Sequence, residues 1–184
     1  MIQTIVTTDT PIEPSQRTNS HTLSILSKNE PGVLMRICQV FARRAFNIDS
    51  LVVSEGYQRE YARMTIGISG DPEGLEQIVK QVNKLIDVIH CCEHTAENSV
   101  VKELALIKFV ANRDDRTEAL HVIEHFGGKT VDLTPTSMIA MIQGDTAKID
   151  AAETMLGQFH IVEMVRTGKV VMARGEQPLS LIHI

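Results

Sequence analysis

The sequence predicts an α+β protein that contains two successive copies of one β-α-β-β-α-β unit. Three observations lead to this prediction: apolar residues recur with strand or helix period in a fixed order, that order occurs twice, and turn-forming residues separate the segments. We expect the units at residues 21–97 and 98–175, with a polar tail at 1–20 and a short tail at 176–184. Each unit should form a ferredoxin-like sandwich, an antiparallel sheet with helices on one face.

The first unit opens with a strand and a helix. The segment "TLSIL" is strand-like, and residues 33–46 space their apolar residues with helical period. A short β-branched segment, "DSLVVSE", and a half-buried strand, "YARMTIGIS", follow and are joined by the loop "EGYQRE". The expected helical stripe consists of Val33, Leu34, Ile37, Cys38, Phe41 and Ala45.

A second helix and a closing strand complete this unit. Asp71 suits the cap of the helix and Pro72 suits its first turn. The segment "VIHCCEH" is then the last strand. The apolar positions of this helix are Leu75, Ile78, Val79, Val82, Leu85 and Ile86.

The second unit repeats the order. The segment "ELALIKFVA" is strand-like, a helix is expected over residues 114–126, and Gly127-Gly128 is a helix stop. The strands "TVDLTP" and "SMIAMIQG" are joined through Pro135, Asp145 or Thr146 caps a further helix, and "IVEMVRTGKVVMARG" ends the unit. The expected apolar positions of the two helices are Ala119, Leu120, Ile123 and Phe126, and Ile149, Ala152, Leu156 and Phe159.

Composition excludes several classes of protein. Hydrophobic residues make up 43% of the chain and charged residues 22%, which is typical of a globular protein. A net charge of −5 and the absence of Trp argue against nucleic acid or an anionic membrane as the main partner. The chain has no apolar run of membrane-span length, and it does not begin like a signal peptide. We therefore expect a cytoplasmic protein.

The cysteines do not indicate a metal site. Cys38, Cys91 and Cys92 are odd in number and lack the usual ligand spacing. Adjacent residues of a strand point to opposite faces, so Cys91 and Cys92 are poorly placed to bind one ion. We expect three reduced thiols with packing roles, and we expect neither a metal nor a cofactor in this chain.

One segment resembles a metalloprotease motif. The sequence "HVIEH" at residues 121–125 matches the H-x-x-E-H pattern. However, His121, Glu124 and His125 lie on the polar side of the expected helix, and no clear third ligand follows. The pattern is therefore better explained as an ordinary solvated helix face.

Two further combinations resemble catalytic sites without their context. The segment "GGKT" at residues 127–130 stands at a helix exit, whereas a phosphate-binding loop leads from a strand into a helix. His90 and Cys92 share one side of an expected strand, but no orienting carboxylate accompanies them. The sequence therefore predicts no catalytic residues.

The turn "NEPG" at residues 29–32 and Asn47, beyond the following helix, admit two interpretations. In the structural one, Asn29 and Pro31 favour the turn, Gly32 supplies an unusual dihedral angle, and Asn47 ends the helix in the left-handed conformation. In the functional one, the free helix N-terminus and the two asparagine side chains hold a small ligand.

The functional interpretation describes a branched-chain amino acid. Backbone N–H groups of residues 32–35 suit a carboxylate, and Gly32 lets a ligand approach the backbone. The amide groups of Asn29 and Asn47 suit an ammonium or a carboxylate. An apolar pocket wall would come from Val33, Leu34 and Ile48. Because the two asparagines lie at opposite ends of one helix, a single ligand would meet both most easily across a dimer contact.

The quoted segments together carry a family resemblance. The unit with "NEPG" at its first strand–helix turn resembles an ACT domain, a small-ligand module of amino-acid metabolism. The stretches "LSKNEPGVLMRICQVFARRAFNIDSLVV", "ARMTI", "LEQIVKQVNKLIDV", "KELALIKF", "VDLTP" and "VRTGKVVMARG" resemble the small, regulatory subunits of acetolactate synthase. The resemblance extends over residues 21–175 in an uninterrupted order.

The resemblance implies a regulatory subunit without a catalytic site of its own. Such a subunit forms a homodimer through its ACT domains, activates a separate catalytic large subunit, and confers feedback inhibition by valine or a related branched-chain amino acid. Thiamine diphosphate, Mg and FAD are then expected in the catalytic partner. The resemblance places effector contacts at Asn29, Gly32, Val33 and Leu34 of one chain and Asn47 and Ile48 of another, and a regulatory or catalytic-subunit contact at Gln77.

A second hypothesis places the chain in another functional class. A free-standing ACT-like protein could bind an amino acid or a metal through the His121 and His125 face. Assay of the purified chain separates the two, because the regulatory hypothesis predicts neither turnover nor stoichiometric zinc. An amino-acid-responsive transcription factor lacks support, since the sequence shows no helix-turn-helix and no basic recognition helix.

Overall fold

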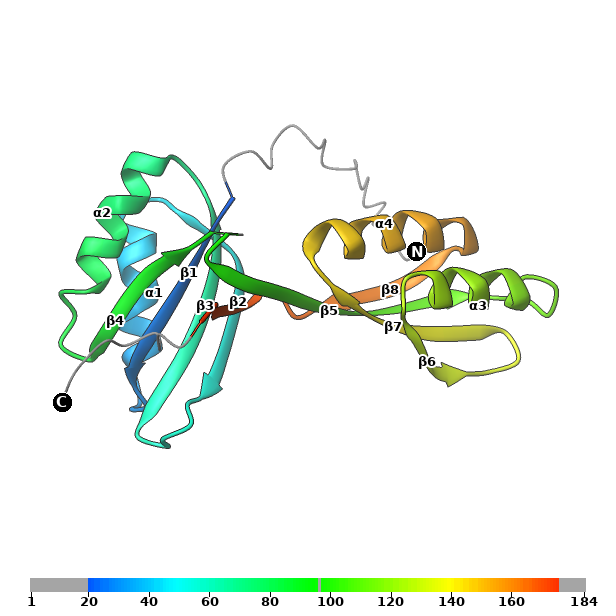
Figure 1. Cartoon of the computed structure of the whole chain (residues 1–184), viewed down its shortest axis with the longest axis horizontal. Coiled ribbons are helices and arrows are strands. Elements are labelled where there is room, and N and C mark those ends of the chain that lie inside the picture. Colours follow the sequence, from blue (N-terminus) through cyan, green and yellow to red (C-terminus); the bar gives the residue numbers. More distant parts are fainter. Residues whose placement is uncertain (1–19, 96, 176–184) are drawn as a thin grey trace, which may run out of the picture.

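A computed structural model describes residues 20–95 and 97–175 of the chain. Two α+β units follow one another, and each consists of an antiparallel sheet with two helices against one face (Figure 1). The predicted fold class is therefore confirmed. Both predicted tails, apart from Ser20, lie outside the described residues.

The first unit contains a four-stranded sheet in the order β2-β3-β1-β4. The central strand β1 pairs with β3 and β4, and Ile25 lies opposite Met64 and Cys91 in the two ladders. Strand β2 forms one edge of the sheet. The elements are β1 (Ser20–Lys28), α1 (Val33–Arg43), β2 (Asn47–Glu55), β3 (Tyr61–Ser69), α2 (Pro72–Val82) and β4 (Val88–His94).

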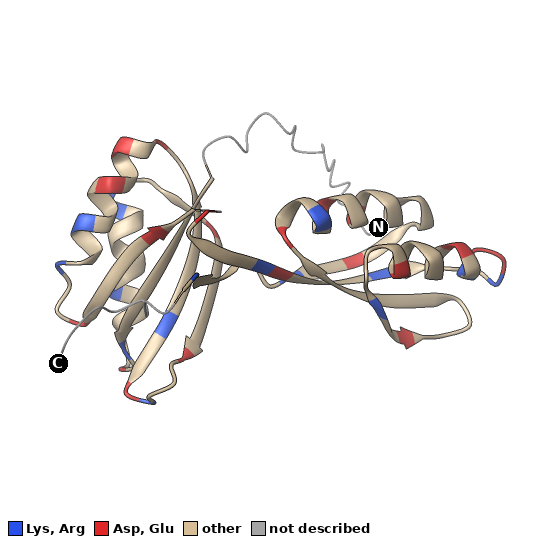
Figure 2. Cartoon of the chain, viewed as in Figure 1, with Lys and Arg blue, Asp and Glu red and all other residues tan. Residues whose placement is uncertain are grey.

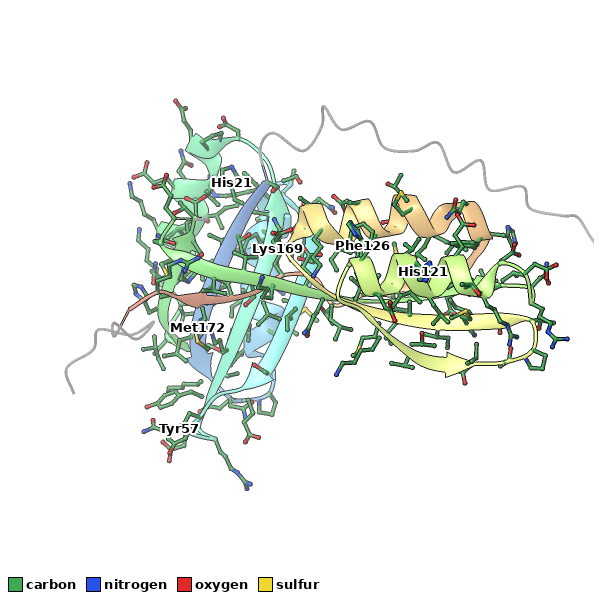
Figure 3. All side chains as sticks on the ribbon, turned by 45° about the vertical axis from the view of Figure 1, so that its right-hand side comes forward. His21, Tyr57, His121, Phe126, Lys169 and Met172 are labelled. Carbon is green, nitrogen blue, oxygen red and sulfur yellow. The ribbon has the colours of Figure 1, made fainter. Side chains whose placement is uncertain are left out.

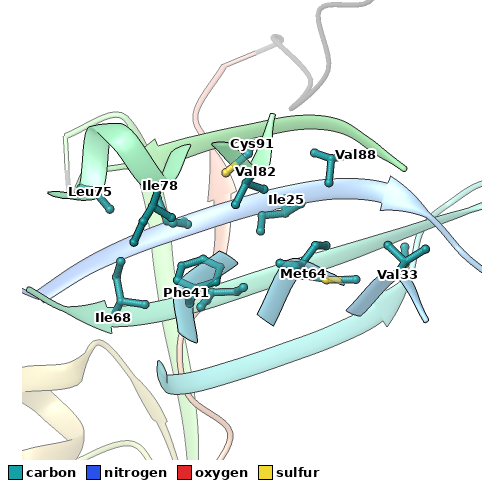
Figure 4. Packing of buried hydrophobic residues seen from close by; sticks show 14 residues of the cluster. Ile25, Val33, Phe41, Met64, Ile68, Leu75, Ile78, Val82, Val88 and Cys91 are labelled. Carbon is teal, nitrogen blue, oxygen red and sulfur yellow. The ribbon is translucent and has the colours of Figure 1, made fainter. Parts of the chain in front are cut away.

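One core joins the helices to the sheet of the first unit. Phe41 of α1 and Ile78 of α2 are fully buried against apolar side chains of the central strands (Figure 4). Side chains along a strand point to opposite faces in turn, so alternate residues of β3, such as Met64 and Ile66, face this core. Buried residues of this core include Leu23, Ile25, Ile37, Met64, Ile66, Ile68, Leu75, Val82 and Cys91.

The second unit repeats this design with a sheet in the order β6-β7-β5-β8. Its separate core contains Phe109 and Phe159, whose ring centroids lie 5.7 Å apart. The elements are β5 (Ser99–Val110), α3 (Arg116–His125), β6 (Lys129–Leu133), β7 (Ser137–Gly144), α4 (Thr146–Leu156), the short 3-10 helix η2 (Gly157–Phe159), β8 (Ile161–Arg166) and β9 (Val170–Ala173).

The last strand connects the two units. β9 pairs with the first residues of β5, as in the register Val101↔Val171. The Nη2 atom of Arg63 donates a hydrogen bond of 2.8 Å to the carbonyl oxygen of Val171. Arg63 alternates with the core residues Ala62 and Met64, so β9 lies over the sheet face that the helices leave open.

The structure corrects several expected boundaries in the first unit. α1 ends at Arg43, two residues before Ala45, which has a φ of +55°. α2 ends at Val82, so Leu85 and Ile86 belong to the following turn. The sequence prediction extended both helices because the helical spacing of apolar residues continues beyond each helix end. Leu85 still contacts the core from the turn, whereas Ile86 is 89% exposed.

Two corrections concern the second unit. α3 buries Val122 and leaves Leu120 39% exposed, because the sheet contacts a slightly different face of the helix than expected. The closing segment 161–175 forms two strands, β8 and β9, separated by a turn in which Gly168 has a φ of +80°. Capping by Asp145, one of the two expected residues, is confirmed by its Oδ1 atom, which accepts from the N–H of Lys148 at 2.8 Å.

Charges of both signs are interspersed over both units, in keeping with the modest net charge (Figure 2). No helix within the described ranges is long and apolar enough to cross a membrane.

Candidate functional site

The turn between β1 and α1 leaves a helix N-terminus open. Gly32 precedes the helix with a φ of +85°, a conformation that suits glycine, and no side chain caps the first turn. No acidic residue lies in that turn either. In contrast, Asp71 caps α2 and Asp145 caps α4 through side-chain hydrogen bonds. The partial positive charge at the start of α1 is therefore available to an external anion.

Asn29 is fixed to the β2–β3 hairpin. Its backbone N–H donates to the carbonyl of Glu60 at 2.8 Å, and its side-chain Nδ2 donates to the carbonyl of Arg59 at 3.0 Å. The hairpin projects beyond the sheet, with Tyr57 at its exposed tip (Figure 3). Because Nδ2 is engaged within the chain, Asn29 presents its Oδ1 atom as an acceptor to a ligand.

Asn47 begins the edge strand β2 and is exposed. Its Nδ2 atom donates to Oδ1 of Asp49 at 2.8 Å, and the hydroxyl of Ser69 donates to Oδ2 of the same carboxylate at 2.6 Å. The expectation that Asn47 ends the helix in the left-handed conformation is wrong, since Ala45 takes that conformation instead. Asn47 thus also presents an amide oxygen beside a carboxylate.

The structure divides the predicted effector residues into two groups. Asn29, Gly32, Val33 and Leu34 lie together at the start of α1, whereas Asn47 and Ile48 lie beyond its end. The 11 residues of α1 separate the groups by about 16 Å, a distance that no single amino acid spans. Within one chain, therefore, the residues form two separate half-sites.

The apolar members of the two groups differ in accessibility. Val33 is 2% exposed and belongs to the core, so only its backbone can meet a ligand. Leu34 is 36% exposed, and Ile48 is half-buried against the core. Of the predicted pocket wall, Leu34 and Ile48 thus have accessible side-chain surface, whereas the side chain of Val33 is buried.

Gln77 lies on the exposed side of α2. Its Oε1 atom accepts a hydrogen bond from Nη1 of Arg44, and the Nε of Arg44 donates to Oε1 of Gln81 at 3.1 Å. This contact ties the C-terminal end of α1 to α2. Gln77 is therefore accessible to a partner and mechanically connected to the helix that carries the open N-terminus.

Sequence reasoning did not single out Arg36, which also lies at the turn. A Cβ atom built on Gly32 would be 3.2 Å from Nη1 of Arg36. Side chains of a helix lean toward its N-terminus, so a residue four positions after the N-cap reaches back to the turn. The four-residue spacing between Gly32 and Arg36 could therefore have indicated that Arg36 lies at the turn.

The thiol and imidazole groups of β4 do not form a catalytic pair. Burial raises the pKa of the Cys91 thiol to about 12 and also raises the pKa of the Cys92 thiol, so both remain protonated and weakly nucleophilic. Burial, together with the nearby positive charge of Arg63, lowers the pKa of His94, which lies 3.7 Å from the Cys92 sulfur. A neutral imidazole beside a protonated thiol is not an activated pair.

The polar face of α3 does not assemble a metal site. His121 and His125 are exposed on that helix, where Figure 3 labels His121, and the ring of His125 contacts Phe126 edge-on at 5.1 Å. Within residues 20–95 and 97–175, no three His, Cys, Asp or Glu side chains come together to hold an ion.

Comparison with known proteins identifies the family. The "AHAS small subunit-like ACT domain" family model matches residues 23–90, and the "small subunit of acetolactate synthase" model matches residues 102–175. The chain belongs to the acetolactate synthase small subunit family. It is accordingly a non-catalytic, regulatory type of subunit with an ACT domain in its first unit.

Individual relatives align with this chain over nearly their whole length. A probable acetolactate synthase small subunit of Archaeoglobus fulgidus is 41% identical over 157 residues, which cover 85% of this chain and 98% of the relative. The acetolactate synthase small subunit of Mycolicibacterium smegmatis is 41% identical over 166 residues, covering 90% and 98%. A crystal structure of the Thermotoga maritima small subunit superposes with a TM-score of 0.78 at 36% identity and covers 86% of this chain and 99% of that one.

Proposed function

We propose that this chain binds a branched-chain amino acid, valine foremost, where two copies meet, and thereby regulates the catalytic large subunit of acetolactate synthase. The open N-terminus of α1 beside Asn29 is the observation that supports this proposal most directly. The N–H groups at the start of α1 can bind a carboxylate, and the neighbouring amide oxygen of Asn29 can bind an ammonium.

The chemistry of the ligand follows from the donors and acceptors that remain. The α-carboxylate accepts from backbone N–H groups at the start of α1, where Gly32 has no side chain to obstruct it. The ammonium donates to Oδ1 of Asn29 and to Oδ1 of the partner subunit's Asn47, since the Nδ2 atoms are engaged within each chain. The aliphatic side chain lies against Leu34 and the partner subunit's Ile48.

A dimer contact along β2 brings the half-sites together. β2 is an edge strand that carries Asn47 and Ile48 at its start. Leu51 and Val53 on the same strand are 36% and 45% exposed, and an uncovered apolar edge favours pairing with another copy. In a twofold dimer each chain contributes both halves, so the dimer holds two equivalent sites.

Regulation then works through linked binding. The chain activates the catalytic subunit on association, and an effector that alters their contact changes both affinities by the same factor. Gln77 and the α2 face around it form the proposed contact with the catalytic subunit. In this proposal the complex is cytoplasmic, the catalytic subunit holds thiamine diphosphate, Mg and FAD, and this chain holds no cofactor.

A reconstitution assay tests the proposal. The catalytic subunit is assayed alone and with this chain, and each mixture is titrated with L-valine, L-leucine and L-isoleucine. We expect the chain to raise the rate and to make it inhibitable, whereas the catalytic subunit alone is largely insensitive to valine. Equal inhibition of the catalytic subunit with and without the chain would contradict the proposal.

A further inference from the structure

Arg36 is held in place at the open turn by a buried carboxylate. Its Nε and Nη2 atoms each lie 2.7 Å from Oδ2 of Asp87, the residue just before β4. Asp87 is only 7% exposed, and its backbone carbonyl accepts from the N–H of Lys28 at 2.8 Å. The acceptor is thus anchored to the end of β1, and the guanidinium is confined to one orientation.

One edge of this guanidinium remains unused. Nη1 makes no hydrogen bond to another residue within 20–95 or 97–175. It lies 3.2 Å from the position that a Cβ on Gly32 would occupy, at the mouth of the helix N-terminus. The side chain of Arg36 is 45% exposed, so this free edge is accessible from solvent.

We propose that Arg36 binds and recognises the carboxylate of the effector. This inference rests on the proposed function and adds a recognition residue to its site. Nη1 donates to the carboxylate from one side while the backbone N–H groups of α1 donate from the other. A charge-assisted bond of this kind is about twice as strong as a neutral one.

Asp87 gives this recognition its selectivity. Because it fixes Nε and Nη2, Arg36 loses little conformational freedom when a ligand binds. Asp87 also balances the charge of the guanidinium, whose Nη1 atom keeps its N–H donors beside the turn at Gly32. The preferred ligand class is therefore α-amino acids with a free carboxylate, and the corresponding amides bind more weakly.

In the competing explanation, the ion pair between Arg36 and Asp87 has a purely structural role. Comparing two ligands distinguishes this role from recognition of the carboxylate. L-Valine and L-valinamide differ only in the carboxylate. If Arg36 recognises the carboxylate, removing the charge of Arg36 weakens valine binding and leaves valinamide binding nearly unchanged. If the ion pair only shapes the turn, both ligands lose affinity in equal proportion.

The experiment is calorimetric titration of the full-length chain with each ligand at about pH 6.5, where an α-amino group with a pKa of about 8 is protonated. We expect the wild-type chain to prefer valine, and Arg36→Gln to lower valine affinity about ten- to hundredfold. The matched control is Arg59→Gln, which removes an equal charge from the neighbouring hairpin, where the side chain is 92% exposed; it should change neither affinity.

A second variant protects the test against misfolding. Arg36→Gln leaves the buried Asp87 without its partner, whereas the double variant Arg36→Gln with Asp87→Asn removes both charges. The double variant should show the same selective loss of valine binding. Equal losses for valine and valinamide, or no loss for either, would overturn the role of Arg36. Absence of valine binding by the wild-type chain would instead refute the proposed function itself.

Discussion

The two units place a strand–helix turn at the same point of the same topology, yet the turns differ in chemistry. In the first unit Gly32 precedes α1 with a φ of +85°, and the first helical turn carries no acidic residue. In the second unit Asp115 precedes α3 with an ordinary φ of −80°, follows Asp114, and is followed by Glu118 in the first turn. A carboxylate ligand would therefore meet open N–H groups at the first turn and three carboxylates at the second.

The arginines at the two turns differ in the same sense. Arg36 of the first unit keeps one edge of its guanidinium unused among the residues that the structure describes. Arg116 of the second unit directs Nη2 to the carbonyl oxygen of Thr134 in the β6–β7 hairpin. The arginine of the first turn therefore keeps donors available to the proposed anion, whereas the arginine of the second turn is bound to its own hairpin. A shared fold does not imply a shared site, because the ligand depends on a few side chains at one turn.

The largest effect is expected when the first turn is given the charge of the second. Gly32→Asp places a carboxylate beside Nη1 of Arg36, where the ligand carboxylate should lie. We expect valine affinity to fall at least about a hundredfold, or about 2.7 kcal/mol. The melting temperature should fall only modestly, because a left-handed residue costs about 1–2 kcal/mol. Calorimetry and thermal unfolding measure the two effects.

Gly32→Ala is the control for backbone strain at this position. It brings the same left-handed conformation without a charge, so its loss of affinity should be clearly smaller. Equal losses for Gly32→Asp and Gly32→Ala would show that strain, and not occupation of a carboxylate position, abolishes binding.

An intermediate effect is expected from Asn29→Ala. The variant removes the Oδ1 acceptor for the ammonium, and a bond to a charged group contributes about 1.5–3 kcal/mol. In the reconstitution assay the variant should still raise the catalytic rate, but inhibition should need about ten- to hundredfold more valine. Inhibition at the wild-type concentration of valine would show that Asn29 only forms the turn and its 3.0 Å bond to Arg59.

The smallest effect is expected from Asn112→Ala, the corresponding change in the second unit. Asn112 accepts the N–H of Asp115 through its backbone carbonyl, a contact that alanine retains. Valine affinity and the number of sites per dimer should both stay at their wild-type values in calorimetry. A reduced number of sites would reveal a second effector site at the acidic turn and remove the distinction between the units.

Periodicity and turn chemistry predicted most of the fold. The strand Tyr61–Ser69, the strand Val88–His94 and the cap at Asp71 agree with expectation, because each depends on residues adjacent in the chain. The pairing of β9 with the start of β5 was beyond such reasoning, since it joins residues about seventy positions apart that no local pattern links.

The candidate site was only partly accessible to the same reasoning. The turn and both asparagines stand out as sequence features, but the use of their Nδ2 atoms depends on neighbours such as Arg59 and Asp49. Arg36 resembles any surface arginine until Asp87, 51 residues later, fixes its orientation. Contacts of this range are set by tertiary packing, which one sequence does not display.

In the proposed site, Asn29 of one chain and Asn47 of another serve the same ligand. Mixing two defective chains tests it directly. Asn29→Ala and Asn47→Ala homodimers each carry a defect in every site, because every site needs one residue of each kind. A mixed dimer combines both defects in one site and leaves the other site fully wild type.

The measurement is calorimetric titration of the re-equilibrated mixture with L-valine, beside each variant alone. Random pairing makes half of the dimers mixed, so about a quarter of all sites should bind with wild-type affinity. Each variant alone should show no such sites. If mixing restores no high-affinity binding, the two asparagines do not complete one site across a dimer, and the account of this chain as a dimeric effector receptor is contradicted.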